Sequence, residues 1–244
     1  MLALLTVMTT KLLLLLAVPL AACASQVDGN NQGEVIATMR GSLTSSRTTE
    51  LPSPEISLVW LKPSQMSEPV GAERVEAKGL LSQFTLSIYS PPPDSMLEMQ
   101  PEVDSWPVGM GLVVVGNQGT DYTDQTQWRG ADLDHMLLYF PEAPPADSAL
   151  TAFLHGPAPT AGFHLYTVTR LTDAERQQRL DCVNALPHSG MSFDYVQVYT
   201  QCRGFGNDEL DLAPDDMNTL LDAKEIEDGA IVQLINGIPH PFGV

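Results

Sequence analysis

The densest mixture of carboxylate and imidazole side chains is the segment Asp132-Leu133-Asp134-His135, with Asp121 and Asp124 shortly before it. Such groups ligate divalent metals and act as general acids and bases. They are either ligands on a loop between two strands or a polar turn that leads into the apolar run at 136–140, and we favour the turn. Histidine spacing does not suggest zinc, because no two histidines are four residues apart: they are His135, His155, His164, His188 and His240.

Carboxylates accumulate near the C-terminus, where nine fall within 21 positions that hold a single lysine, Lys224. They are Asp208, Glu209, Asp211, Asp215, Asp216, Asp222, Glu225, Glu227 and Asp228. Calcium takes about six to eight oxygen ligands, which such a region could supply. However, Asn207–Asp211 lacks the glycine and the D-x-D-x-D register of an EF-hand loop. We favour a solvated acidic face, and keep a hydrolase that uses carboxylates or calcium as the alternative.

Nucleophilic catalysis finds little support in the sequence. His188-Ser189-Gly190 places an imidazole next to a hydroxyl, but adjacent side chains rarely face each other, and no G-x-S-x-G motif is present. Gly109-Met110-Gly111 precedes an apolar run, whereas a dinucleotide fingerprint follows one. The sequence therefore predicts no catalytic residues, no metal ligands and no cofactor, and it leaves open whether the protein is an enzyme.

The first 22 residues have the features of an export signal: one positive charge at Lys11, a leucine run at 12–16 and small residues before Cys23. The segment Leu20-Ala21-Ala22-Cys23 resembles the lipobox of bacterial lipoproteins. The resemblance implies cleavage before Cys23, lipidation of its sulfur and, because Ala24 follows, sorting to the outer membrane. The alternatives are an uncleaved transmembrane anchor and an ordinary signal peptide with a later cleavage site.

The start of the leader is unusual, because the apolar residues 1–7 precede the only positive charge. Initiation at Met8 would place Lys11 near the front of a leader that ends before Cys23, which is the usual order of a signal peptide. We therefore expect Met8 to be the initiator, with use of Met1 as the alternative.

With Cys23 lipidated, Cys182 and Cys202 remain as an even pair in an oxidising compartment. We expect these two cysteines to form a disulfide. A reactive thiol or a metal site is the alternative, although neither cysteine belongs to a C-x-x-C pair.

Composition limits the classes of partner. The chain has 244 residues, 43% of them hydrophobic, with 12 Lys and Arg against 30 Asp and Glu, for a formal net charge of -18. A surface of this charge repels phosphate backbones, so no nucleic-acid partner is expected. The expected organisation is a signal peptide at 1–22, a lipidated cysteine and polar flexible tether at 23–34, and one β-rich extracytoplasmic domain at 35–244.

Short apolar or alternating runs, bounded by turn residues, predict eight strands at 35–40, 56–61, 84–89, 110–115, 136–140, 163–168, 193–199 and 231–235. The run at 110–115 is continuously apolar, as in a strand buried on both faces. Thr172-Asp-Ala-Glu175 is a capping box that predicts a helix to about Val183. Pro214, followed by two aspartates, predicts a helix to about Ala223, and a third helix is possible from Ser148 to Leu154.

These patterns predict a mainly β fold, an antiparallel sandwich-like domain of about eight short strands with two or three short helices, with α+β as the alternative. The function expected is that of a binding or structural module held in the bacterial cell envelope by the lipid on Cys23. Its expected partners are the membrane, through that lipid, and an envelope protein or glycan.

Overall fold

The computed structural model describes residues 33–45, 54–61, 74–78, 83–99, 106–187, 194–206, 208 and 210–225. The predicted leader with Cys23, nearly all of the tether, the segment 188–190 and the strand expected at 231–235 lie outside these residues. The chain divides into two compact units, Met1–Glu34 and Val35–Val244, and the description below concerns the second. No helix among the described residues is long and apolar enough to cross a membrane.

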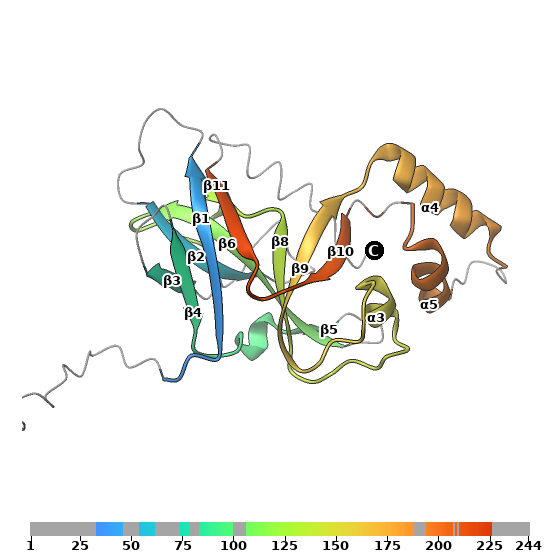
Figure 1. Ribbon diagram of the computed structural model, residues 1–244, viewed down its shortest axis with the longest axis horizontal. Helices are drawn as coiled ribbons and strands as arrows, with labels where there is room; N and C mark the ends of the chain where they lie inside the picture. Colours follow the sequence, from blue (N-terminus) through green and yellow to red (C-terminus); the bar gives the residue numbers. More distant parts are fainter. Residues whose placement is uncertain are drawn as a thin grey trace, which may run out of the picture. The chain divides into compact units, whose positions relative to one another are not determined.

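The protein is mainly β, as predicted, with short helices beside a mixed sheet (Figure 1). In chain order the strands are β1 Ala37–Ser45, β2 Pro54–Leu61, β3 Arg74–Lys78, β4 Phe84–Ile88, β5 Glu98–Met99, β6 Pro107–Asn117, β7 Gly130–Ala131, β8 His135–Phe140, β9 Gly162–Arg170, β10 Leu210–Asp215 and β11 Leu220–Glu225. They pair in the order β10-β9-β8-β6-β2-β3-β4-β1-β11-β7, and β5 adds to β6. The helices are η2 Asp94–Met96, η3 Gln125–Gln127, α3 Ala149–Phe153, α4 Asp173–Ala185, α5 Tyr195–Gln197 and η4 Val198–Cys202, the last a π-helix.

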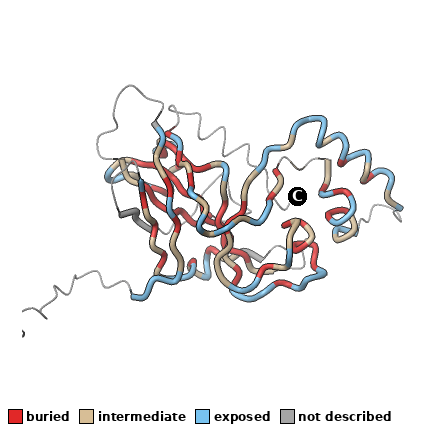
Figure 2. The backbone as a smooth tube through the Cα atoms, viewed as in Figure 1, coloured by how far each residue is buried: buried red, intermediate tan, exposed pale blue. Residues whose placement is uncertain are grey.

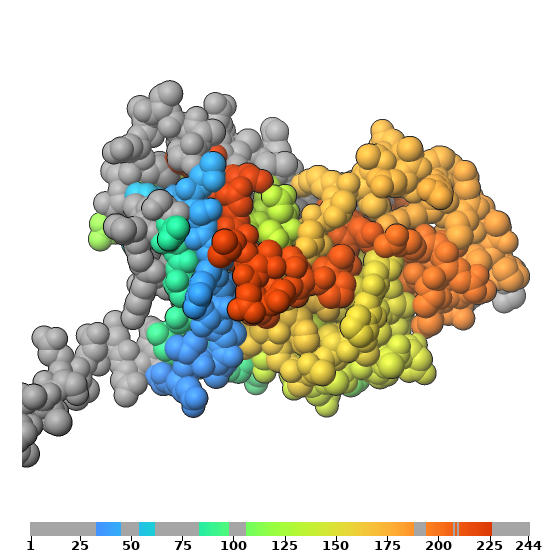
Figure 3. Space-filling view, in the orientation of Figure 1, coloured from blue at the N-terminus to red at the C-terminus, as the bar shows by residue number. Residues whose placement is uncertain are grey.

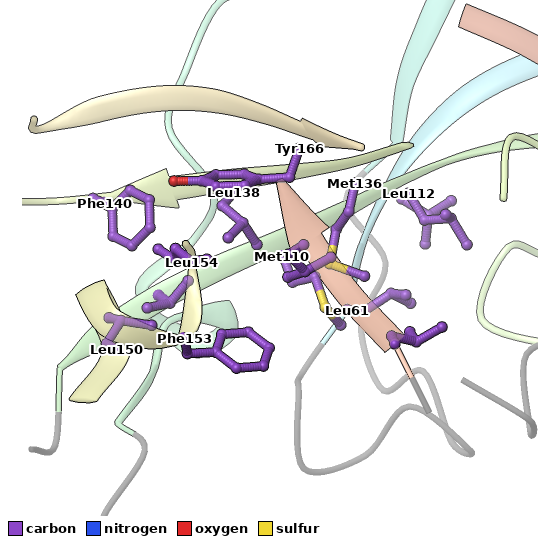
Figure 4. Close-up of a cluster of buried hydrophobic side chains, with 14 of the residues drawn as sticks. Leu61, Met110, Leu112, Met136, Leu138, Phe140, Leu150, Phe153, Leu154 and Tyr166 are labelled. Atoms are coloured by element: carbon purple, nitrogen blue, oxygen red, sulfur yellow. The ribbon is translucent and has the colours of Figure 1, made fainter. Parts of the chain in front are cut away.

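Most residues of the central strands are buried (Figure 2). Their side chains contribute to two hydrophobic clusters, one on each face of the sheet. Along β6, Leu112 and Val114 enter the first cluster, whereas Val113 and Val115 enter the second, as the two-residue period of a strand requires. This arrangement confirms that the run at 110–115 is a fully buried strand. In the first cluster, drawn in Figure 4, Leu150, Phe153 and Leu154 lie with Met110, Leu138 and Phe140 and hold α3 against the sheet.

One pairing departs from the antiparallel pattern expected. β1 runs parallel to β11, with Arg40 beside Leu220 and Ser45 beside Glu225. β1 also continues through Gly41, where the sequence predicted its end. Gly41 packs closely against Phe84 and Leu221, so this position of the strand has no room for a side chain. The two-residue β7 pairs with both β11 and β6. Such contacts join distant parts of the chain, so local patterns could not reveal them.

Two helices formed as the sequence predicted. The side chains of Thr172 and Glu175 make the capping box at the start of α4, which ends two residues beyond the expected Val183. α3 occupies the third predicted helix and begins at Ser148, whose hydroxyl accepts a hydrogen bond from the Thr151 amide at 3.1 Å.

Two predicted elements were wrong. The segment expected as a helix from Pro214 is the end of β10, a turn and β11, because Asp215 and Asp216 accept hydrogen bonds from the turn's own groups and Pro214 lies in a strand at the end of the sheet order. Residues 194–199 of the run expected as a strand at 193–199 do not form a strand. Asp194 accepts a hydrogen bond from the Gln197 amide at 3.1 Å and starts a helical segment that runs through α5 and η4.

Candidate functional site

The two acidic regions of the sequence meet at His135, which begins β8. Its Nδ1 lies 3.0 Å from Oδ2 of Asp132, and its Nε2 lies 3.7 Å from Oδ2 of Asp215. Asp222 contributes its backbone amide, which donates to Asp132 Oδ2 at 3.1 Å. Asp132, His135, Asp215 and Asp222 are called the His135 cluster below.

Asp132 is the centre of the His135 cluster and is 1% exposed. Its Oδ1 accepts hydrogen bonds from the amides of Asp134 and His135, at 2.9 and 3.1 Å, while Oδ2 accepts from Asp222. Burial raises the pKa of Asp132, and the His135 ring and these backbone donors partly offset that effect. The carboxylate therefore joins the loop before β8 to β11 and has its lone pairs occupied.

There is little space for a ligand at the His135 cluster. The void beside Asp132 and His135 has a volume of about 10 Å³ and is otherwise lined by apolar residues and Gly111. A volume of this order holds about one water molecule. An imidazole between two carboxylates is an arrangement suited to proton transfer, but the void described beside it is too small for a substrate. We therefore assign this cluster to the architecture of the sheet, in line with the polar turn predicted at 132–135.

The remaining acidic residues predicted as possible ligands are used in local structure. Asp121 accepts from the amide and hydroxyl of Thr123, and Asp124 accepts from Thr126 and Gln127, which lowers the pKa of both carboxyls. Among the described residues, no group of three or more His, Cys, Asp or Glu side chains is arranged to hold a metal ion.

A second histidine, His155, forms a different cluster with groups from α4, η4 and β10. Its Nε2 lies 2.8 Å from Oδ1 of Asp211, and Oδ2 of the same carboxylate lies 3.2 Å from Arg179 and 3.8 Å from Arg203. Asp208 lies nearby and accepts from the Phe205 amide at 2.6 Å. His155, Arg179, Arg203, Asp208 and Asp211 are called the Asp211 cluster.

Electrostatics differ between the two carboxylates of the Asp211 cluster. Burial raises the pKa of Asp208 to about 6, although the Phe205 amide and the charge of Arg179 act in the opposite direction. Burial acts to raise the pKa of Asp211 as well, but the close contact with His155 and the charges of His155, Arg179 and Arg203 outweigh it and leave the pKa lowered. The ionised form of Asp211 is therefore favoured, and its carboxylate is the common partner of the basic groups around it.

Two of the residues around Asp211 have backbone dihedral angles in the left-handed helical region. His155 follows α3 with φ 50°, and Arg203 ends η4 with φ 60°. Residues other than glycine rarely adopt this conformation, and π-helical turns and such outliers are frequent at functional sites. Cys202, directly before Arg203, forms the predicted disulfide with Cys182 of α4, with the two Cα atoms 5.5 Å apart. The backbone that carries Arg203 is therefore held covalently.

His155 and Arg203 line an open cavity of about 460 Å³, the α3–η4 cavity, between the segments 146–156 and 196–203. The parts of the chain to which these segments belong meet on the face of the molecule drawn in Figure 3. Its lining is polar in large part and includes the hydroxyl groups of Ser148, Thr151 and Thr200. Arg203 has 67% of its side chain exposed, whereas Arg179 is 9% exposed. Because the α3–η4 cavity combines space with an accessible charge, it is the candidate binding site.

Sequence reasoning predicted neither this cavity nor the partners of Asp211. Asp208 and Asp211 were singled out as acidic residues, but His155, Arg179 and Arg203 carry no motif and lie far apart in the chain. The one usable signal was the position of Arg203, next to a cysteine expected in a disulfide. No protein-family model, no curated protein and no solved structure matches this chain.

Proposed function

We propose that the protein is a lipid-anchored binding module of the bacterial cell envelope, with the α3–η4 cavity as its ligand site. One observation carries the binding role: the cavity of about 460 Å³ is lined by Arg203, a cation that is 67% exposed. Sites for small molecules have volumes of about 300–1,000 Å³ and a few well-placed polar groups. The volume and lining of this cavity agree with such a site.

The envelope location is supported by two features. The leader ends in Leu20-Ala21-Ala22-Cys23, and Cys182 and Cys202 are joined in the folded domain. Disulfides persist in oxidising compartments and are rare in the cytosol. With the lipid on Cys23 and a polar stretch at 24–34 behind it, the domain would stand away from the membrane with its cavity accessible.

Anchoring is tested by fractionating cells that express the full chain. We expect the protein in the membrane fraction with an acylated N-terminal cysteine in its mass spectrum, and Cys23→Ser released or left as an uncut precursor. A mature membrane protein with an unmodified Cys23 would contradict the proposal.

Ligand binding is tested with the low-molecular-mass fraction of an envelope extract from the source bacterium. The native mass spectrum of the domain should show a retained small molecule, and Thr200→Trp, which fills the α3–η4 cavity, should abolish that retention. Thr169→Trp, at an exposed position of β9, is the matched control. Equal retention by both variants, or no retention by the unmodified domain, would argue against a ligand site in this cavity.

A further inference from the structure

We infer that the α3–η4 cavity recognises a small hydroxylated anion, a molecule that carries a carboxylate or phosphate group on a polyhydroxy skeleton. The inference rests on the proposed binding function and adds the chemical class of the ligand. Three properties of the cavity carry it: an available guanidinium, a fixed backbone and hydroxyl groups with acceptor capacity to spare.

Arg203 is the available cation. It lies 3.8 Å from Asp211 Oδ2, whereas Arg179 lies closer, at 3.2 Å, and His155 holds the other oxygen at 2.8 Å. Asp211 therefore keeps two partners if Arg203 turns toward a ligand. A guanidinium presents several N–H donors in a planar fork that matches a carboxylate or phosphate. An anion in the cavity can therefore pair with Arg203 while the buried carboxylate of Asp211 keeps its contacts with Arg179 and His155.

The backbone that presents Arg203 is fixed from both sides. Cys202 is tied to α4 by the disulfide, and the amide of Phe205 donates to Asp208 at 2.6 Å. On the opposite wall, Ser148 caps α3 and Thr151 donates to the carbonyl of Pro145 at 2.8 Å. Preorganised walls reduce the entropy that a ligand must overcome on binding. The cavity is therefore built in advance of its ligand.

Hydroxyl groups of the lining have already donated their protons within the protein. Thr200, which is exposed, donates to the carbonyl of Val196 at 2.6 Å. Thr151 donates to Pro145 and Ser148 donates to Thr151 at 3.1 Å, but these two residues are buried and each hydroxyl oxygen already accepts one hydrogen bond, so Thr200 is the most accessible of the three. A hydroxyl oxygen that has donated its proton retains lone pairs for further hydrogen bonds. Ligand O–H groups are the natural donors to them, which is why the skeleton is expected to be hydroxylated.

Asp147 is the one carboxylate of the described cavity lining and is exposed. It opposes an anionic ligand by like-charge repulsion, as does the net charge of -18 of the whole chain. Selectivity for an anion therefore depends on Arg203, with His155 as the other basic group of the lining. Removal of the Arg203 charge should therefore lower the affinity for an anion, and removal of the Asp147 charge should raise it.

The test compares three probes that share one sugar skeleton: glucose, glucuronate and glucose 6-phosphate. Isothermal titration of the folded domain should give measurable binding for at least one of the two anions and a weaker or undetectable signal for glucose. Comparing glucuronate with the phosphate ester distinguishes the two sources of the charge. Loss of a charge-assisted hydrogen bond typically costs about tenfold or more in affinity, and this is the effect expected for Arg203→Gln.

Three further variants control for charge and fold. Arg203→Lys should recover part of the affinity, and Asp147→Asn should raise it by about two- to threefold, because a repulsion is removed. Arg176→Gln removes a positive charge from α4 outside the described lining of the cavity and should change the affinity little. Melting curves of all variants verify that they are folded.

Equal affinity for glucose and the two anions would overturn the inference and leave the binding function intact. So would an anion affinity that Arg203→Gln does not change. If none of the three probes binds, the inference also fails, whereas the proposed function is decided separately by the Thr200→Trp experiment with envelope extract.

Discussion

The protein contains two histidines paired with carboxylates, and the surroundings of the two pairs differ in every other respect. His135 lies between Asp132 and Asp215 beside a void of about 10 Å³. His155 contacts Asp211 at the edge of a cavity of about 460 Å³, and Arg179 and Arg203 pair with the same carboxylate. A histidine–aspartate pair thus joins parts of the sheet at His135, whereas a pair of the same types lies beside an open cavity at His155.

The difference shows that the residue types alone do not define a site. Asp132 has its oxygens occupied by backbone amides, so replacing it removes structural hydrogen bonds. Arg203 is exposed and has only a distant partner in Asp211, so replacing it changes what the cavity attracts. We therefore expect changes in the His135 cluster to lower stability, and changes at the cavity to alter binding with little effect on stability.

The largest expected effect is that of Asp132→Asn, which preserves volume and tests the hydrogen bonds alone. Either orientation of the amide places its NH2 group against a backbone N–H, because both oxygens of Asp132 accept from the backbone. The amide NH2 group and at least one backbone N–H are then buried without an acceptor, and at about 1–3 kcal/mol each they cost about 2–6 kcal/mol in the free energy of unfolding. Urea denaturation measures this loss.

Asp134→Asn is the matched control for Asp132→Asn. Asp134 pairs with Lys224 at 2.7 Å, but its side chain is 57% exposed. Surface ion pairs contribute about 0–1 kcal/mol, so the control should change stability by no more than that. Similar losses for the two variants would remove the reason for treating the His135 cluster as architectural.

The next effect is that of removing the disulfide with Cys182→Ser and Cys202→Ser together. The bond closes a loop with a sequence separation of 20, which corresponds to about 3 kcal/mol in the chain-entropy model. Because Arg203 follows Cys202, the double variant should also bind the preferred anion more weakly at a temperature where it remains folded. A stability loss with unchanged affinity would show that the disulfide does not position the wall of the cavity.

Several of the elements predicted from local patterns were right. The run at 110–115 is apolar throughout because β6 is buried on both faces, and the capping box of Thr172 and Glu175 is a contact between near neighbours. The disulfide was predicted from the two cysteines that remain when Cys23 is set aside as the expected lipidation site. The helix predicted from Pro214 was wrong because a proline fits the first turn of a helix but also fits a strand in which its missing N–H is not required for pairing with a neighbouring strand.

Other features required distant partners and could not be predicted. β7 is two residues long, and the parallel pairing of β1 with β11 joins the segments 40–45 and 220–225, which are far apart in the chain. The Asp211 cluster combines Arg179 of α4 and Asp211 of β10 with residues that follow α3 and η4, so it forms only when these distant parts of the chain come together. The candidate site was therefore missed for the same reason as the sheet topology.

A smaller effect concerns Asp208, whose pKa is raised by burial from 3.8 to about 6. Between about pH 4 and 6 the folded state holds a proton that the unfolded state has released, so stability should fall as the pH rises through this window and level off above it. Asp208→Asn should flatten this dependence and be more stable than the unmodified protein at pH 7, by about 1–2 kcal/mol. Denaturation midpoints at several pH values measure both effects, and an unchanged pH profile in the variant would contradict the assignment.

The smallest expected effect is that of calcium. The described carboxylates of the acidic region are held by other groups: Asp211 by His155 and Arg179, Asp215 by Thr167 and Thr219, and Asp222 by Thr44. We therefore expect micromolar calcium to leave Tm unchanged relative to a sample treated with chelator. An increase of several degrees would favour the alternative in which carboxylates bind a metal.

The central claim is that ligand binding takes place in the α3–η4 cavity and not at the His135 cluster. The most direct measurement is a ¹H–¹⁵N correlation spectrum of the folded domain during titration with the anion that binds best. We predict that amide signals from the segments 146–156 and 196–203 shift with ligand concentration, while those of 132–135 and 215–222 stay in place. Shifts concentrated in 132–135 and 215–222 would contradict the account.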